Sequence, residues 1–324
     1  MFRLSPVVFY RNKYVAFLGI LCLSLMLLTG CTIENEPKDP ILTLEPAPPK
    51  SNDATVCDEL KSLGGTIETN DDGHVTKIEL RGTGVSGQEI KKLKNTGAIE
   101  YLRLSGSTVS DSTLPSLRRM PNLKTLSLNN SSVTDTALRR LGELQKLEKL
   151  HLANVLITDK TLEQIGKLPN LRQLQISGTN ITNKGLKHLA KASTLRDLDL
   201  SSTKIADTGA AELAALVDLE KLNLYRTDVS NQGLKDLESL KNLAWLNLDA
   251  TKVTDEGLPS LEAFPNLAWL HLGRTTITNK GVDALLKLKQ LKELYVTNTD
   301  IFGEDLLRLR DGLSDCKIHD DTKQ

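Results

Sequence analysis

The stretch Leu243–Asn266 reads LAWLNLDATKVTDEGLPSLEAFPN, and the residues on either side repeat its pattern. The following 24 residues, from Leu267, read LAWLHLGRTTITNKGVDALLKLKQ, and the preceding 24, from Leu219, read LEKLNLYRTDVSNQGLKDLESLKN. The register holds without an insertion through ten repeats, which begin at Val75, Ile99, Leu123, Leu147, Leu171, Leu195, Leu219, Leu243, Leu267 and Leu291. One small structural unit therefore recurs along most of the chain.

Each repeat predicts a short strand followed by a short helix. Leu243, Leu246 and Leu248 alternate with other residues, which is typical of a strand with one buried face. The later apolar residues follow helical spacing, and Thr254 and Asp255 stand where side-chain oxygens cap a helix. One repeat cannot bury its own apolar face, so we expect the repeats to stack around a continuous core.

Asp or Asn recurs immediately before each expected helix. We interpret these residues as helix caps that recur because the repeat recurs, rather than as a carboxylate ladder with a function of its own. They are Asp111, Asp135, Asp159, Asn183, Asp207, Asn231, Asp255 and Asn279.

The repeat pattern, LxxLxLxxTx(I/V)(T/S)(D/N)xGLxxLxxLxx, resembles that of the leucine-rich-repeat family over Val75–Ile318, about three quarters of the chain. The resemblance implies an α/β fold, a curved solenoid of about ten repeats with a parallel sheet on its concave face and short helices on its convex face. The position usually held by Asn in the family is mostly Thr or Ser here. These residues are Thr83, Ser107, Ser131, Thr179, Thr203, Thr227, Thr251, Thr275 and Thr299.

Caps are expected at both ends of the solenoid, which with its C-terminal cap spans residues 75–319. Residues 53–74 predict a helix, ended by Gly64 and Gly65, and the first strand of a hairpin that pairs with Val75–Leu80. Asp305–Leu313 predicts the last helix, residues 316–319 a final edge strand, and residues 320–324 a loose tail. Cys57 and Cys316 fall in opposite caps, too far apart for a disulfide, so we expect free thiols.

The first 52 residues predict targeting and tethering. Residues 1–30 combine three basic residues, no acidic residue and an apolar run, as in a signal peptide. The sequence Leu28-Thr29-Gly30-Cys31 resembles a bacterial lipobox, which implies that Cys31 is acylated. Proline-rich residues 31–52 predict an extended tether. The resemblance implies a lipid-anchored protein of the bacterial cell envelope, more probable at the outer than at the inner membrane, facing the periplasm or the exterior. The alternative is an ordinary membrane anchor.

Charge and motifs argue against several functions. The net charge is zero for the full chain and −3 once residues 1–30, with three basic residues, are removed, so no basic surface for nucleic acid is indicated. The motifs GxxxxGK(S/T), HExxH, GxSxG and CxxC are absent. His151 and His271 share a strand position but lie five repeats apart, too far for one metal. We therefore expect no catalytic, cofactor or metal site.

A candidate binding surface lies at the outward positions of each repeat, the third, fifth, seventh and eighth. Of the seven aromatic residues after Cys31, five occupy these positions, and the chain's only tryptophans hold the third position of adjacent repeats. Trp, Tyr and Arg are enriched in binding hot spots. We therefore predict a partner-binding surface formed by Tyr225, Arg226, Trp245, Asn247, Trp269, His271, Arg274 and Tyr295.

Four functions remain open from the sequence. The first is recognition of a protein or peptide on the concave face of the C-terminal repeats. The second is glycan binding, since sugar rings also stack on Trp and Tyr. The third is a structural envelope protein without a specific ligand, in which Trp245 and Trp269 only stack on each other. The fourth, an enzyme, lacks a supporting motif.

Overall fold

The computed structural model describes residues 52–81, 88–93, 95–106, 108–112, 114 and 117–321. The chain divides into two compact units, Met1–Pro48 and Pro49–Gln324, and all described residues belong to the second. The expected signal segment 1–30, the acylation site Cys31 and residues 31–51 of the expected tether lie outside the described residues.

The described strands form one sheet in which the order in space equals the order in sequence. The first pair, β1 and β2, is antiparallel, and each later strand pairs in parallel with the strand 24 residues before it. The strands are β1 (Thr66–Thr69), β2 (Val75–Arg81), β3 (Tyr101–Ser105), β4 (Thr125–Ser127), β5 (Lys149–His151), β6 (Gln173–Gln175), β7 (Asp197–Asp199), β8 (Lys221–Asn223), β9 (Trp245–Asn247), β10 (Trp269–His271), β11 (Glu293–Tyr295) and β12 (Lys317–His319).

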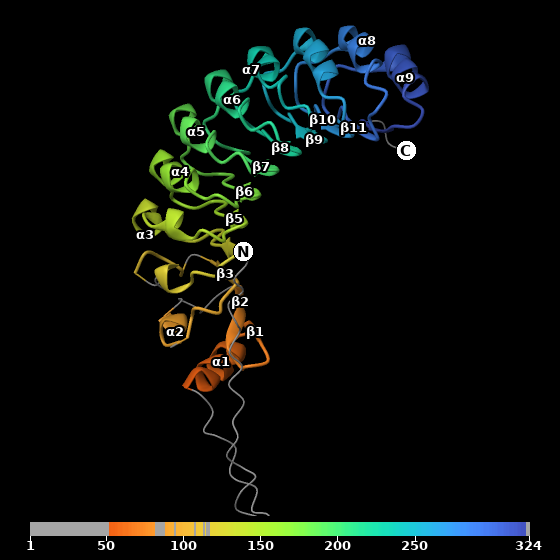
Figure 1. Ribbon diagram of the computed structural model, residues 1–324. Helices are drawn as coiled ribbons and strands as arrows, with labels where there is room; N and C mark the ends of the chain where they lie inside the picture. Colours follow the sequence, from red (N-terminus) through yellow and green to blue (C-terminus); the bar gives the residue numbers. More distant parts are fainter. Residues whose placement is uncertain are drawn as a thin grey trace, which may run out of the picture. The chain divides into compact units, whose positions relative to one another are not determined.

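Short helices follow the strands and cover the opposite side of the unit (Figure 1). The α-helices are α1 (Asn52–Ser62), α2 (Gln88–Lys91), α3 (Asp135–Leu138), α4 (Asp159–Ile165), α5 (Asn183–Leu189), α6 (Asp207–Leu213), α7 (Asn231–Asp236), α8 (Val282–Leu285) and α9 (Gly303–Gly312). Four segments of the described residues are 3-10 helices, η1 (Leu117–Arg119), η2 (Leu141–Glu143), η3 (Asp255–Ala263) and η4 (Asn279–Gly281). Pro259 within η3 has no N–H to donate to an α-helical bond, which accounts for the tighter helix of that repeat.

The core is a column of aliphatic side chains between strands and helices. Leu222, Leu246 and Leu270 lie beside one another on adjacent strands and are fully buried. Within this unit the strands line the concave side and the helices the convex side (Figure 1). The predicted solenoid is confirmed.

The helix, hairpin and edge strand expected at the two ends of the solenoid are present, with small shifts in their bounds. At the N-terminal end, α1 is followed by the antiparallel β1–β2 hairpin, and at the C-terminal end α9 is followed by the edge strand β12. Cys57 is buried, Cys316 is partly buried, and both are free thiols. Burial raises the pKa of the Cys316 thiol to about 11.

The recurring Asp and Asn residues do not cap the helices, contrary to the sequence-based interpretation. Where a side chain caps a helix, as at Thr134, Thr158 and Ser230, it belongs to the residue before the Asp or Asn. The carboxylates and amides turn instead toward the next repeat. Asp207, for example, accepts hydrogen bonds from the backbone nitrogen of Ser230 at 2.7 Å and from its hydroxyl at 2.6 Å. The bond from the backbone nitrogen recurs from Asp111 to Asn279 and ties neighbouring repeats together.

This link also explains the recurring glycine of the repeat. A Cβ atom on Gly233 would lie 2.5 Å from the Asp207 carboxylate oxygen. The backbone must approach this closely for the link to form, so a larger residue does not fit. The Thr position has a different role, because the Thr251 hydroxyl donates to the Leu248 carbonyl of its own repeat at 2.6 Å.

Asp207→Ala is expected to lower the free energy of unfolding by about 1.5–3 kcal/mol, because the Ser230 backbone N–H loses its charged acceptor. Asp207→Asn should change it by less than about 0.5 kcal/mol, since Asn231 makes the equivalent link with its amide. The control is Asp228→Ala, which removes only an exposed ion pair with Lys252 and should cost at most about 1 kcal/mol. Urea unfolding measures all three. A loss for Asp207→Ala no larger than the loss for Asp228→Ala would show that the link does not stabilise the stack.

Candidate partner-binding surface

The third and fifth positions of β9 and β10 lie on the outward side of the sheet, as the sequence predicts. Trp245 and Asn247 are half-buried, whereas Leu246 between them is fully buried. The placement of the seventh and eighth positions on the strand face is wrong, because β8, β9 and β10 end at the fifth position. Tyr225, Arg226 and Arg274 lie in the turns that follow. The eighth residue has a left-handed backbone, with φ of 53° at Arg226 and 51° at Arg274, and this conformation ends the strand.

Five rings form a continuous aromatic row across β9–β12, namely Trp245, Trp269, His271, Tyr295 and His319. The two indoles stack with centroids 4.2 Å apart and an interplanar angle of 11°. Tyr295 lies 5.1 Å from Trp269 and stacks on His271 at 4.8 Å and on His319 at 4.0 Å. Sequence reasoning missed His319, although it lies 24 residues after Tyr295 and 48 after His271, at the same repeat position.

Small residues and a hollow border the aromatic row. The second position of the neighbouring repeats holds a charged residue, as in Glu220 and Lys292, but it is Ala244 and Ala268 beside the two tryptophans. At the C-terminal end of the row lies a hollow of about 350 Å³. It is lined by Tyr295, Thr297, Arg310, Lys317, Ile318, His319 and Asp320. The surface therefore combines rings, small residues and a recess.

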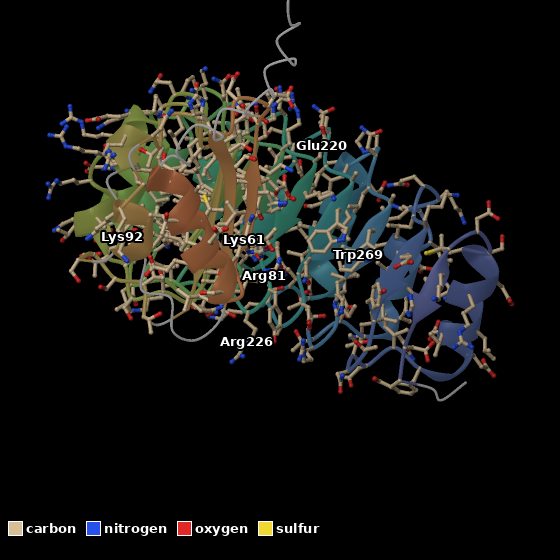
Figure 2. The ribbon with its side chains drawn as sticks, turned by 90° about the horizontal axis from the view of Figure 1, so that it is seen from below. Lys61, Arg81, Lys92, Glu220, Arg226 and Trp269 are labelled. Carbon is tan, nitrogen blue, oxygen red and sulfur yellow. The ribbon has the colours of Figure 1, made fainter. Side chains whose placement is uncertain are left out.

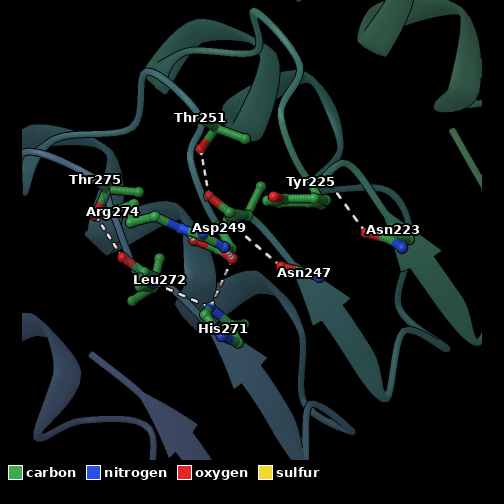
Figure 3. A network of polar contacts seen from close by, with 11 residues as sticks. Asn223, Tyr225, Asn247, Asp249, Thr251, His271, Leu272, Arg274 and Thr275 are labelled. Atoms are coloured by element: carbon green, nitrogen blue, oxygen red, sulfur yellow. Dashed lines mark hydrogen bonds and ion pairs between the residues drawn. The ribbon is translucent and has the colours of Figure 1, made fainter. Parts of the chain in front are cut away.

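Several polar residues of the predicted site help to build the turns (Figure 3). The side chains of Asn223, Asn247 and His271 accept hydrogen bonds from backbone nitrogens two residues later, at 3.1, 2.9 and 3.1 Å. Burial lowers the pKa of His271, so its ring is neutral near pH 7 and its Nδ1 can accept from Gly273. The Asn247 carbonyl oxygen is thus engaged in the fold.

A buried carboxylate anchors one of the predicted arginines. Asp249 is 4% exposed, and it accepts from Arg274 Nε at 2.8 Å and from Arg274 Nη2 in a forked pair. This hydrogen bonding to Asp249 raises the pKa of Arg274 above its ordinary value. Arg274 also lies over the Tyr225 ring, with its Cζ 5.1 Å from the centroid, and Figure 3 shows these residues together. The turns of β8, β9 and β10 therefore meet at Tyr225.

Within the described part of the chain, no group of three or more His, Cys, Asp or Glu side chains is arranged to hold a metal ion. Nor does any described helix have the length and apolar character to cross a bilayer.

A glycine-rich pattern lies between β2 and α2. Gly82–Gly87 reads GTGVSG and so matches G-x-G-x-x-G, the glycine pattern of dinucleotide-binding loops. It lies outside the described residues, between β2 and α2. Gly82 holds the eighth position of the repeat that begins at Val75, and α2 has only four residues. A short pattern in this repeat context is a weak signal, and we assign no nucleotide site to it.

Comparisons with known proteins agree with this geometry. A family model described as a leucine-rich repeat matches residues 167–190 and 191–214, two consecutive repeats. Among solved structures, an internalin C2 of Listeria monocytogenes is 25% identical and covers 63% of this chain and 83% of its own, with a TM-score of 0.52. A second internalin of the same species is 19% identical and covers 87% of this chain and 99% of its own, with a TM-score of 0.51. Curated proteins gave no match by sequence.

The chain is a leucine-rich-repeat protein, on the evidence of its repeat register, its parallel sheet and these matches. This fold and its structural relatives favour a role in interaction or as a scaffold.

Proposed function

We propose that this protein recognises an extended segment of a protein or peptide on the concave side of β8–β12. The observation that carries the proposal is the aromatic row, in which five half-buried rings contact one another across four adjacent strands. The buried side of the sheet is already filled by aliphatic residues, so core packing does not require these rings. Rigid aromatic side chains contribute much contact area at little entropic cost, as binding surfaces need.

The geometry of the row supports a peptide better than a glycan. A sugar ring stacks on the exposed face of an aromatic ring. The ring centroid of Trp269 lies 4.2 Å from that of Trp245 and 5.1 Å from that of Tyr295. These neighbouring rings would compete with a sugar for the faces of Trp269. Ring edges remain to be contacted, and edges suit the side chains and carbonyl oxygens of a peptide.

Selection from a displayed library of random dodecapeptides on the purified full chain tests the proposal. A panel of soluble oligosaccharides is measured in parallel by calorimetry. We expect peptides to be enriched on the wild type, to be lost on the Trp245→Ala/Trp269→Ala variant, and to be retained on Thr125→Ala/Lys149→Ala. The last two residues occupy the same strand position on β4 and β5. Calorimetric binding of an oligosaccharide, without enrichment of peptides, would favour glycan binding. Absence of a ligand of either class would favour a structural role.

We also propose that Cys31 is acylated and tethers the solenoid to a membrane of the bacterial envelope. The support is the sequence Leu28-Thr29-Gly30-Cys31 after a basic and then apolar segment, followed by a proline-rich stretch. A single acyl chain binds membranes weakly and reversibly, so we expect more than one chain on the processed cysteine.

Intact mass of the membrane-extracted protein should show the loss of residues 1–30 and the addition of lipid. Cys31→Ala should abolish both the processing and the lipid. Cys57→Ala, which removes another thiol of the chain, serves as the control and should leave both unchanged. A processed protein that stays in the membrane fraction after Cys31→Ala would rule out the tether at this residue.

A further inference from the structure

Two long basic side chains occupy a backbone position that disfavours them. At the eighth position of the repeats, where φ is positive, the other described residues are small or are Asn, namely Gly106, Asn130, Asn154, Gly178, Ser202, Ala250 and Asn298. Arg226 and Arg274 are the exceptions, two repeats apart. Non-glycine residues in the left-handed region cost of order 1–2 kcal/mol, with Asn the best tolerated. Such strain is typical of residues that are kept for a function.

Both arginines converge on one ring. Arg274 Cζ lies 5.1 Å and Arg226 Cζ 5.9 Å from the centroid of Tyr225. The backbone around them is fixed, because the Arg226 nitrogen donates to the Asp249 carbonyl at 3.0 Å and the Tyr225 nitrogen donates to the Asn223 side chain. Asp249 holds Arg274 in turn. The Arg274 guanidinium group and the Arg226 backbone are thus held in place before any partner arrives.

The two arginines differ in how many of their guanidinium N–H groups are free to bind a partner. Arg274 uses Nε and Nη2 on Asp249. Arg226 is exposed, and in the described part of the chain no carboxylate forms an ion pair with it. The nearby Asp228 is already paired with Lys252 at 2.6 Å. Figure 2 shows Arg226 extending away from the ribbon. Two guanidinium charges and one buried carboxylate leave a single uncompensated positive charge at this place.

We propose that Arg226, Tyr225 and Arg274 form a clamp for one carboxylate side chain of the bound peptide. The inference rests on the proposed function and assigns a chemical class to part of the partner. A guanidinium group binds a carboxylate in a planar, charge-assisted arrangement. A single negative charge matches the net charge of the clamp. A phosphate group, with a charge of about −1.5 to −2, would exceed it. The ligand is therefore an acidic residue, Asp or Glu, in a peptide that also covers the aromatic row.

The test uses dodecapeptides that are selected on the full wild-type chain. Each selected peptide is then synthesised in versions in which one Asp is replaced by Asn, or one Glu by Gln. We expect one acidic position at which the replacement weakens binding about five- to tenfold. The main variant is Arg226→Asn, because Asn occupies this position in three other repeats and keeps the left-handed turn. This substitution should weaken binding of the acidic peptide by the same factor. The variant should then bind the acidic and the amide peptides with equal affinity.

Two further variants separate charge from geometry. Arg226→Lys keeps the positive charge but lacks the planar guanidinium group. Compared with Arg226→Asn, it should restore part of the preference for the acidic over the amide peptide. Lys204→Asn removes one exposed positive charge from the preceding repeat, where no carboxylate of the described part of the chain forms an ion pair with it, and should leave the preference intact. Raising the salt concentration should weaken binding of the acidic peptide more than binding of the amide peptide.

Each other outcome is decisive. Peptides that bind with no acidic preference, or with a preference that survives Arg226→Asn, overturn the clamp and leave the proposed function standing. A phosphoserine peptide that binds more tightly than its glutamate counterpart through Arg226 overturns the assignment to a carboxylate. If the wild type retains no peptide, the proposed function fails and the clamp fails with it.

Discussion

Leu246→Ala is expected to lower the free energy of unfolding by about 2–5 kcal/mol. Leu246 is fully buried on β9, between Leu222 of β8 and Leu270 of β10. Truncation removes apolar contacts and leaves a cavity that the neighbouring repeats cannot close without moving the sheet. Because each repeat contacts only its neighbours, the loss should spread to the repeats on either side.

Asn247→Ala is the matched control for this prediction, one residue further along the same strand. It removes the hydrogen bond from the Asp249 nitrogen at 2.9 Å and should cost about 1 kcal/mol. Chemical denaturation of both variants compares the two faces of one strand. Similar losses at the two positions would contradict the assignment of buried and outward faces on β9.

The second large effect concerns binding. Trp245→Ala with Trp269→Ala should weaken a selected peptide by more than about 2 kcal/mol, or about thirtyfold. The two indoles stack at the centre of the aromatic row, so their removal takes away both contact area and its rigid support. Loss of the stack should also lower stability by about 0.5–1.5 kcal/mol, which thermal unfolding measures.

The control for this pair is Thr125→Ala/Lys149→Ala, which should leave the affinity unchanged. A double tryptophan variant that melts at a lower temperature but binds the peptide as well as the wild type would mean that the stack is only structural. The concave binding surface would then have to be abandoned, and the leucine-rich-repeat fold would remain.

The fold was largely predictable because one period governs the whole sequence. Leu222, Leu246 and Leu270 recur every 24 residues at the same repeat position. This register determines which residues are buried and which strands pair. The edge strand β12 could also be predicted, because Lys317–His319 lies in the same register. The role of Asp207 could not be predicted, because its hydrogen-bond partner Ser230 lies in the next repeat. Local spacing is equally consistent with a helix cap and with a link between repeats.

The candidate surface was predictable in composition but not in its internal contacts. The outward placement of Trp245 and Trp269 follows from alternation along the strand. The ring planes, the 4.2 Å stack and the inclusion of His319 depend on side-chain conformations that the pattern does not determine. The anchoring of Arg274 by Asp249 arises because the turn at the eighth position redirects the arginine toward the preceding repeat, so residues 25 apart in sequence meet.

The most direct measurement is tryptophan fluorescence, because Trp245 and Trp269 are the only tryptophans of the chain. A selected peptide that lacks tryptophan is titrated into the full-length protein, and the binding constant is measured independently by calorimetry. The account predicts that the emission changes in intensity and shifts to shorter wavelength as the indoles lose water, with the same binding constant as the calorimetric titration. Calorimetric binding without any change in emission would contradict a site at the aromatic row.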